Sequence, residues 1–210
     1  TYRMYKPSMH EKIMSRLTME QDLWKAIKNN EFEMYYQPKV NLKTGSIEAL
    51  EALIRWHHPS GKHISPAVFI PLAEESRLIH IIGEWTVENT CGQIQEWYQK
   101  FGDAVKVGIN LSGRQFEQPD LVKKFKRIIK SKGVLPKHLE IEVTETAVMA
   151  NINTAVNILE QFRELGIQVS LDDFGAGYTS LGYLKKLPID TLKIDQSFIR
   201  DCTDNSNLAI

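Results

Sequence analysis

The sequence is poor in cysteine and has no long apolar run. Its two cysteines, Cys91 and Cys202, lie far apart among 210 residues and match no zinc-binding spacing. This pattern disfavours a cysteine-based metal site and favours a reduced, cytoplasmic protein. No apolar stretch approaches the ~20 residues that span a bilayer, and the polar first residues lack the apolar core of a signal peptide.

The chain also lacks an excess of charge of either sign. It has 26 basic and 26 acidic side chains, so its formal net charge is zero. Charge therefore gives no reason to expect binding to nucleic-acid polymers or contact with a membrane surface. The one dense basic run, Leu121–Lys132, carries apolar residues at helical spacing and predicts an amphipathic helix with a solvated basic face.

Strand and helix patterns alternate along most of the chain. The first two predicted strands, Phe32–Val40 and Ile47–Trp56, flank a turn and are expected to form an antiparallel hairpin. Later strands are each followed by a helical pattern, which predicts a parallel sheet with right-handed crossovers and hence an α/β fold. These later strands are Val105–Leu111, Leu139–Thr144, Ile167–Leu171 and Thr191–Ile194. The predicted helices are Ser8–Asn29, Pro66–Leu78, Ile82–Lys100, Leu121–Lys132, Thr154–Leu165 and Leu181–Lys186, and another starts near Ser197.

The strand at Ile167–Leu171 runs directly into two adjacent carboxylates, Asp172 and Asp173. A buried strand seldom ends in two carboxylates unless a positive group lies nearby, because unpaired charge is costly to bury. Gly175 and Gly177 follow, and glycine permits positive φ and a close approach by a ligand. Taken alone, such a pair is more often an exposed acidic loop after a strand.

Polar side chains recur at comparable positions on the other strands. Successive side chains of a strand alternate between its two faces, and the apolar alternates are expected to face the helices. The other face then carries Glu51, Arg55, Asn110, Glu142, Asp172, Lys193 and Asp195. Most of them lie near the carboxyl ends of strands, where parallel α/β folds place their sites.

Three carboxylates and an amide oxygen that converge are suited to a hard cation such as Mg²⁺ or Mn²⁺. Without a cation, such crowded carboxylates would repel one another or bind protons. Taken singly, Glu51 or Glu142 could instead form a structural salt bridge with Arg55 or Lys193. Asn110 alone could be a turn residue at a strand end, and Lys193 alone could be a surface lysine. Together, the coincidence of faces and strand ends favours a metal site.

These residues lie within motifs that resemble the EAL domain of bacterial cyclic-di-GMP phosphodiesterases. The resemblance runs from about Leu17 to the last residue. The motifs that carry it are YYQPK (Tyr35–Lys39), EALIRW (Glu51–Trp56), FIPLAEES (Phe69–Ser76), NLSGRQF (Asn110–Phe116), EVTET (Glu142–Thr146), DDFGAGYTSL (Asp172–Leu181) and LKIDQSFI (Leu192–Ile199).

The resemblance implies a TIM-like (β/α) barrel with an antiparallel first strand. It also implies metal-dependent hydrolysis of cyclic-di-GMP to linear pGpG in bacterial second-messenger signalling. By the same resemblance, Glu51, Asn110, Glu142 and Asp172 are ligands of one Mg²⁺ or Mn²⁺ ion, and Asp173 helps to hold a second.

The resemblance assigns roles to further residues around these ligands. Lys193 is expected to orient the attacking water, and Gln37, Arg55 and Asp195 are expected to contact the nucleotide. Glu145 is expected to anchor the loop after the aspartate pair, a region through which a homodimer is expected to form. Lys39, which follows Gln37-Pro38, is expected not to touch the matched ligands.

The resemblance also suggests how the chain is divided. Residues 1–16 resemble the tail of a GGDEF domain, so residues 17–210 are expected to be an EAL domain in a longer chain with GGDEF and sensor domains. The family barrel has two more strands, which carry a further glutamate and a glutamine. The sequence is therefore expected to stop before the barrel closes, and the 210 residues alone are expected to be a poor enzyme.

Two other functions remain open at this point. A non-catalytic cyclic-di-GMP receptor would share the fold. Such family members usually lose metal ligands, whereas every ligand that is matched within these residues is present. An enolase-like enzyme would use carboxylates on Mg²⁺ with Lys193 as a base. The Gln37-Pro38 motif and the Asp172-Asp173 pair followed by glycines fit that enzyme poorly.

Overall fold

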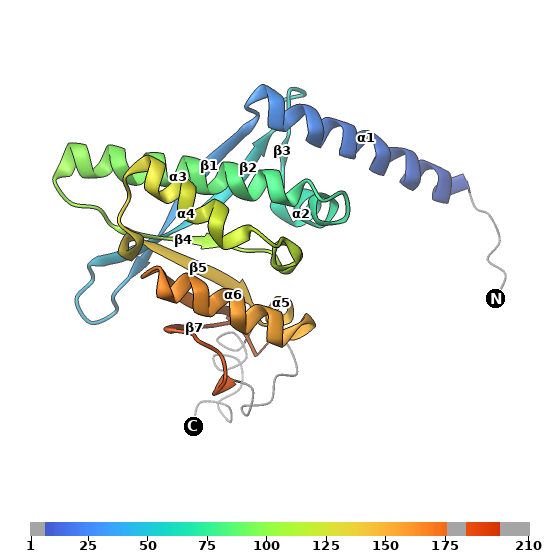
Figure 1. The fold of residues 1–210 in the computed structure, drawn as a ribbon. Coiled ribbons are helices and arrows are strands. Elements are labelled where there is room, and N and C mark those ends of the chain that lie inside the picture. The colour runs from blue at the N-terminus through green and yellow to red at the C-terminus, as the bar shows by residue number, and fades with distance from the viewer. Residues whose placement is uncertain (1–6, 176–183, 198–210) are drawn as a thin grey trace, which may run out of the picture.

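The structure is a computed structural model that describes residues 7–175 and 184–197. Its centre is a seven-stranded sheet in the order β1-β2-β4-β5-β6-β7, with β3 paired to β2 (Figure 1). The strands are β1 (Phe32–Val40), β2 (Ile47–His57), β3 (His63–Ile64), β4 (Lys106–Asn110), β5 (Leu139–Thr144), β6 (Gln168–Phe174) and β7 (Thr191–Ile194). The helices are α1 (Pro7–Asn29), α2 (Pro66–Glu75), α3 (Ile79–Phe101), η1 (Gly113–Glu117), α4 (Leu121–Lys132), η2 (Pro136–His138), α5 (Glu145–Ala150) and α6 (Ile152–Glu164).

The strand directions confirm the predicted α/β fold. Strand β1 is antiparallel to β2, whereas β2, β4, β5, β6 and β7 run parallel to their neighbours. The short loop after β1 permits only a hairpin return, while the helical connections return each later strand in the same direction. Among the described strands, the sheet does not close on itself.

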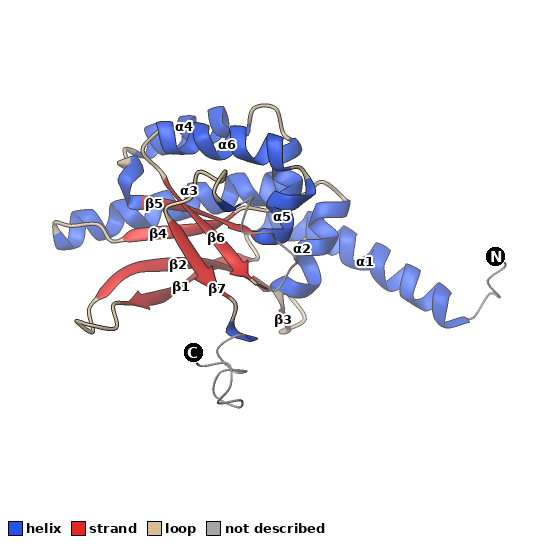
Figure 2. Cartoon of the chain, turned by 90° about the horizontal axis from the view of Figure 1, so that it is seen from below, coloured by secondary structure: helices blue, strands red, loops and turns tan. Residues whose placement is uncertain are grey.

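The main core lies between the sheet and the helices on one of its faces. Figure 2 shows α3, α4 and α6 together on that side. Val107 and Ile109 of β4 and Ile141 and Val143 of β5 are each at most 2% exposed and belong to this core. Because these are alternate residues of their strands, Asn110 and Glu142 must point to the opposite face.

A second core joins the hairpin to α1, α2 and the start of α3. Trp56 of β2 is fully buried here and packs edge-on against Phe69 of α2. Ser65 caps α2 by accepting a hydrogen bond from the backbone nitrogen of Ala67, as its position before Pro66 predicts. The first half of α1 extends away from this core (Figure 1).

Several elements differ from the sequence prediction. Strand β6 continues past Leu171 to Phe174, because Phe174 pairs with Ile194 of β7 after a local irregularity. The short helix α5 was not predicted, although Thr144 caps it by accepting from the backbone nitrogen of Ala147. The predicted helix Leu181–Lys186 lies partly outside the described residues, as does the one starting near Ser197.

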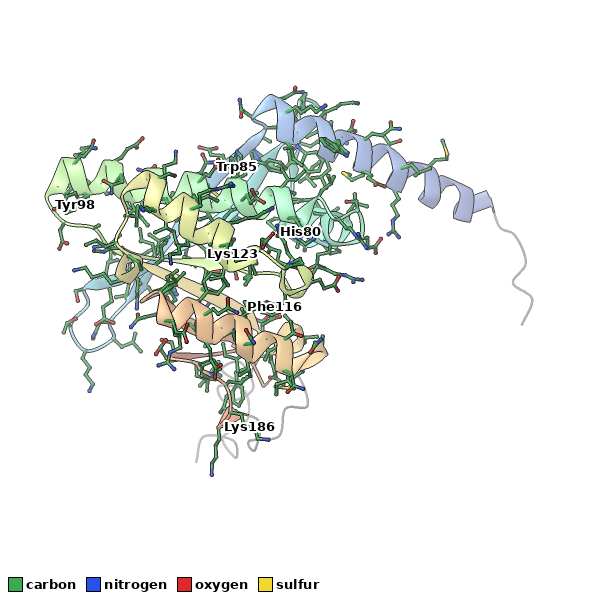
Figure 3. The ribbon with its side chains drawn as sticks, viewed as in Figure 1. His80, Trp85, Tyr98, Phe116, Lys123 and Lys186 are labelled. Atoms are coloured by element: carbon green, nitrogen blue, oxygen red, sulfur yellow. The ribbon has the colours of Figure 1, made fainter. Side chains whose placement is uncertain are left out.

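The basic run forms α4 with the predicted boundaries. Its inner side packs Phe125, which is 2% exposed, while the Lys123 side chain is 85% exposed on the outer side (Figure 3). The amphipathic pattern of the sequence is therefore confirmed. In the described part of the chain, no helix combines the length and apolar character needed to cross a membrane.

The main core should depend strongly on Phe162 of α6. This side chain is fully buried, and its ring meets that of Phe125 edge-on with 5.4 Å between centroids. We expect Phe162→Ala to lower the free energy of unfolding by about 3–5 kcal/mol through lost burial and a residual cavity. Phe101→Ala is the matched control, because Phe101 is 66% exposed and its loss should cost about 0.5 kcal/mol or less. Equal losses in denaturant titrations would contradict this description of the core.

Candidate functional site

One polar side chain from each of the five parallel strands comes to the face of the sheet opposite the helices. These side chains are Glu51 of β2, Asn110 of β4, Glu142 of β5, Asp172 of β6 and Lys193 of β7. Pairing places Asn110 beside Glu142, and Asp172 beside the last residue of β5. The parallel register therefore brings together residues that are up to 142 positions apart in the sequence.

Three of these residues form what we call the carboxylate cluster: Glu51, Glu142 and Asp172. Each offers one oxygen, and these three oxygens lie within 4.8 Å of one another. Glu142 is 1% exposed, whereas Glu51 and Asp172 are partly exposed. Asn110 joins the cluster at its rim, where its side-chain nitrogen donates to Glu51 Oε1 at 2.9 Å. An arrangement of this kind could hold a metal ion.

The ammonium group of Lys193 balances the charge of the cluster. Its Nζ donates to Asp172 Oδ2 at 2.6 Å, to Glu51 Oε2 at 3.1 Å and to Glu142 Oε2. Burial alone would lower the pKa of Lys193, but the hydrogen bonds to Asp172 and Glu142 outweigh it and raise this pKa above its usual range. Lys193 is therefore a permanent cation shared by three carboxylates.

A second buried ion pair lies next to the cluster. Lys39 of β1 donates from Nζ to Glu142 Oε1 at 2.5 Å and to Glu140 Oε2 at 2.8 Å. Glu140 is 2% exposed and also accepts a hydrogen bond from Ser170 Oγ. The expectation that Lys39 does not touch the matched ligands is wrong, because its side chain reaches Glu142 on β5. Glu140 was also missed, although its position two residues before Glu142 puts it on the same face.

A glycine makes room for the Glu142 side chain. Gly108 of β4 pairs with both Glu51 and Glu140, so it lies between β2 and β5. A Cβ atom at Gly108 would be 1.8 Å from Glu142 Oε1 and 2.8 Å from its Cδ. Any other residue here would displace the buried carboxylate, which explains why a strand centre carries glycine.

Asp173 lies near the end of β6, and Glu145, the first residue of α5, contacts the residue that follows this strand. Asp173 adopts φ = 54° and is exposed, and it is not among the three carboxylates of the cluster. Its pKa is raised by burial and by repulsion from Asp172 and Asp195. Glu145 is 3% exposed and accepts a hydrogen bond from the backbone nitrogen of Gly175 at 2.9 Å. Residues 176–183, where the homodimer contact is predicted, lie outside the described residues.

The three predicted nucleotide contacts lie on β1, on β2 and directly after β7. Gln37 lies directly opposite Glu51 in the β1–β2 register. The Arg55 guanidinium stacks 5.5 Å from the centre of the Tyr35 ring. Asp195 follows β7 and accepts hydrogen bonds from the backbone and hydroxyl of Ser197.

A cavity of about 640 Å³ lies between part of this site and the helices α2 and α3. Arg55, Asn110 and Glu142 line it on the side of the sheet, and much of the remaining lining is apolar. Its volume falls within the ~300–1,000 Å³ typical of small-molecule sites. Glu142 of the carboxylate cluster thus borders a space large enough for an organic ligand.

Comparison with known proteins identifies one family across this chain. The family model for the EAL domain matches residues 20–210. The signaling protein YkoW of Bacillus subtilis is 42% identical over 200 residues, which cover 95% of this chain and 25% of YkoW. The bifunctional diguanylate cyclase/cyclic di-GMP phosphodiesterase MucR of Pseudomonas aeruginosa is 37% identical over 206 residues, which cover 98% of this chain and 30% of MucR. The chain therefore spans a quarter to a third of the length of these relatives.

Solved structures agree with the sequence comparison. The PaMucR phosphodiesterase in complex with c-di-GMP superposes with a TM-score of 0.85 and 38% identity, covering 91% of this chain and 78% of that one. Such structural relatives are TIM-like barrels, so the open sheet described here corresponds to part of a barrel.

The fit between Gly108 and Glu142 gives a test of the site geometry. We expect Gly108→Ala to destabilise the protein by about 1–3 kcal/mol, because the added methyl group overlaps a buried carboxylate that has little room to move. Gly92→Ala is the matched control: Gly92 lies within α3 and nothing lies within 4 Å of its Cβ position. That change should stabilise by about 0.5–1 kcal/mol through helix propensity. A Gly108→Ala protein that melts at or above the wild-type temperature would contradict the placement of Glu142.

Proposed function

The chain belongs to the EAL domain family, and we propose that it hydrolyses cyclic-di-GMP to linear pGpG with the help of divalent metal ions. The observation that carries this proposal is the carboxylate cluster, in which Glu51, Glu142 and Asp172 converge from three different strands. The substrate is suggested by MucR, whose name includes cyclic di-GMP phosphodiesterase and whose structure is a c-di-GMP complex.

The donor atoms of the site fit Mg²⁺ or Mn²⁺. Carboxylate and amide oxygens are the preferred ligands of these hard cations, and no thiol or imidazole belongs to the cluster. We assign one ion to Glu51, Asn110, Glu142 and Asp172, with Asp173 contributing to a second. When bound, such ions supply positive charge that activates water and stabilises the charge that develops on a phosphate.

The other residues of the site have roles that follow from their positions. We propose that Lys193, as a permanent cation beside the cluster, orients the attacking water and the phosphate. Gln37, Arg55 and Asp195 are proposed to contact the nucleotide, with Arg55 supplying a fixed positive charge for a phosphate. Glu145 is proposed to hold the loop after the aspartate pair through its bond to Gly175.

The organisation of the longer protein is also a proposal. We assign residues 17–210 to the EAL domain and residues 1–16 to the connection with a GGDEF-like domain. The start of the family match at residue 20 and the bifunctional name of MucR support this division. Homodimerisation through the segment after Asp173 and attachment to sensor domains are proposed in the same sense, as is a place in the cytoplasm.

Metal dependence is the first test of this function. We expect the complete domain to require Mg²⁺ or Mn²⁺ to form pGpG from cyclic-di-GMP, and we expect product formation to fall to background in excess EDTA. Ca²⁺ should not replace them, because its larger and looser coordination suits in-line displacement less well. Chromatography of the nucleotide products measures the outcome. Undiminished hydrolysis in EDTA would contradict a metal-dependent mechanism.

Removal of one cluster carboxylate is the second test. Glu51→Ala should reduce turnover by about 100-fold or more, because the change deletes a proposed metal ligand while Gln37 and Arg55 can still hold nucleotide. Glu48→Ala is the matched control, since Glu48 is an exposed carboxylate on the same strand. Wild-type turnover in Glu51→Ala would refute the site, and cyclic-di-GMP binding without turnover in the wild type would favour the receptor function.

A further inference from the structure

The carboxylate of Glu142 is held by two lysines that come from the strands at the two ends of the sheet, β1 and β7. Lys193 of β7 contacts Oε2, and Lys39 of β1 contacts Oε1 at 2.5 Å. Oε2 is therefore the oxygen that shares Lys193 with Glu51 and Asp172, while Oε1 points towards β1. Each oxygen of this one carboxylate has its own cationic partner.

Lys39 reaches β5 across two intervening strands. In the strand register, Lys39 lies opposite Ala49 of β2, and Gly108 of β4 pairs with Glu140. Ala49 itself pairs with Lys106, so the lysine side chain crosses the sheet obliquely, from the row of Ala49 towards the row of Gly108 and Glu140. The absence of a side chain at Gly108 makes room for the Glu142 carboxylate that Lys39 meets.

Lys39 is itself fixed in place by Glu140. Its Nζ is 2.8 Å from Glu140 Oε2, and Ser170 binds the other oxygen of Glu140. The two hydrogen bonds from Nζ therefore fix the direction from which the ammonium group approaches Glu142.

We propose that Lys39 is a positioning residue for divalent-ion binding: anchored by Glu140, it holds Glu142 Oε1 so that Oε2 faces Glu51 and Asp172. This inference rests on the proposed function, because it concerns the ion that the cluster would bind. Its physical basis is that the terminal torsion of glutamate is broad and roughly two-fold, so no rotamer preference fixes the carboxylate plane. Partners at both oxygens fix it instead, as the outer partners of metal ligands do in other sites.

The sign of the effect separates positioning from simple electrostatics. On charge alone, removing Lys39 would strengthen cation binding, because a positive charge near the cluster disappears. Positioning makes the opposite prediction. We expect Lys39→Met to weaken Mn²⁺ binding about 10- to 100-fold, measured by electron paramagnetic resonance titration of the nucleotide-free protein. Lys43→Met is the matched control: Lys43 is exposed in the β1–β2 turn, and its loss should leave the affinity unchanged.

A double variant tests whether Lys39 serves only as the counter-ion of Glu140. Lys39→Met alone would leave the Glu140 carboxylate without its ammonium partner. Adding Glu140→Gln removes that carboxylate charge as well. If Lys39 positions Glu142, Mn²⁺ binding should stay weakened in the double variant. If the double variant binds Mn²⁺ as tightly as wild type, the role is only structural and the proposal is overturned. Should Lys39→Met fail to fold, this charge-balanced variant carries the test.

Glu51→Ala distinguishes failure of this proposal from failure of the proposed function. If wild type binds no Mn²⁺, or binds it equally well after Glu51→Ala, the metal site itself is refuted and this inference falls with it. If binding depends on Glu51 but Lys39→Met binds as tightly as wild type or more tightly, only the positioning role is overturned. Weakened binding in Lys39→Met and in the double variant, with Lys43→Met unchanged, supports the proposal.

Discussion

The need to balance several carboxylates in a confined space governs this structure. Two lysines balance this charge, one from each end strand of the sheet. Lys193 of β7 contacts three carboxylates, and Lys39 of β1 contacts Glu140 and Glu142. Glu142 stands at the junction, almost completely buried, and burial raises its pKa despite hydrogen bonds from both lysines. Because the charged form of Glu142 remains unfavourable to bury, a further cation could bind at this carboxylate.

The sheet supplies the geometry that this balance requires. Parallel strands present their carboxyl ends at one edge, so each strand contributes one side chain without any long loop. The helices α3, α4 and α6 cover the other face and provide the main core. The side chains of the core and those of the site therefore lie on opposite faces of the same strands, because successive side chains of a strand alternate between its faces.

The cavity beside Glu142 could hold an organic ligand. The cavity of about 640 Å³ combines largely apolar walls with Arg55 and Asn110, which can bind charged and polar groups. Glu145 connects the site to the loop after β6 through the backbone of Gly175.

The sequence by itself determined the α/β fold and the antiparallel first strand, because these follow from local periodicity and from the lengths of the connections. It also determined the face on which Glu51, Glu142 and Asp172 lie, because that follows from the alternation of side chains. It also indicated the family through motifs that span most of the chain. Only the tertiary structure decided that Lys39 contacts Glu142, since that contact joins strands 103 residues apart and depends on the curvature of the sheet. Periodicity assigns a residue to a face, but the partner it meets there is set by how the strands are ordered and packed.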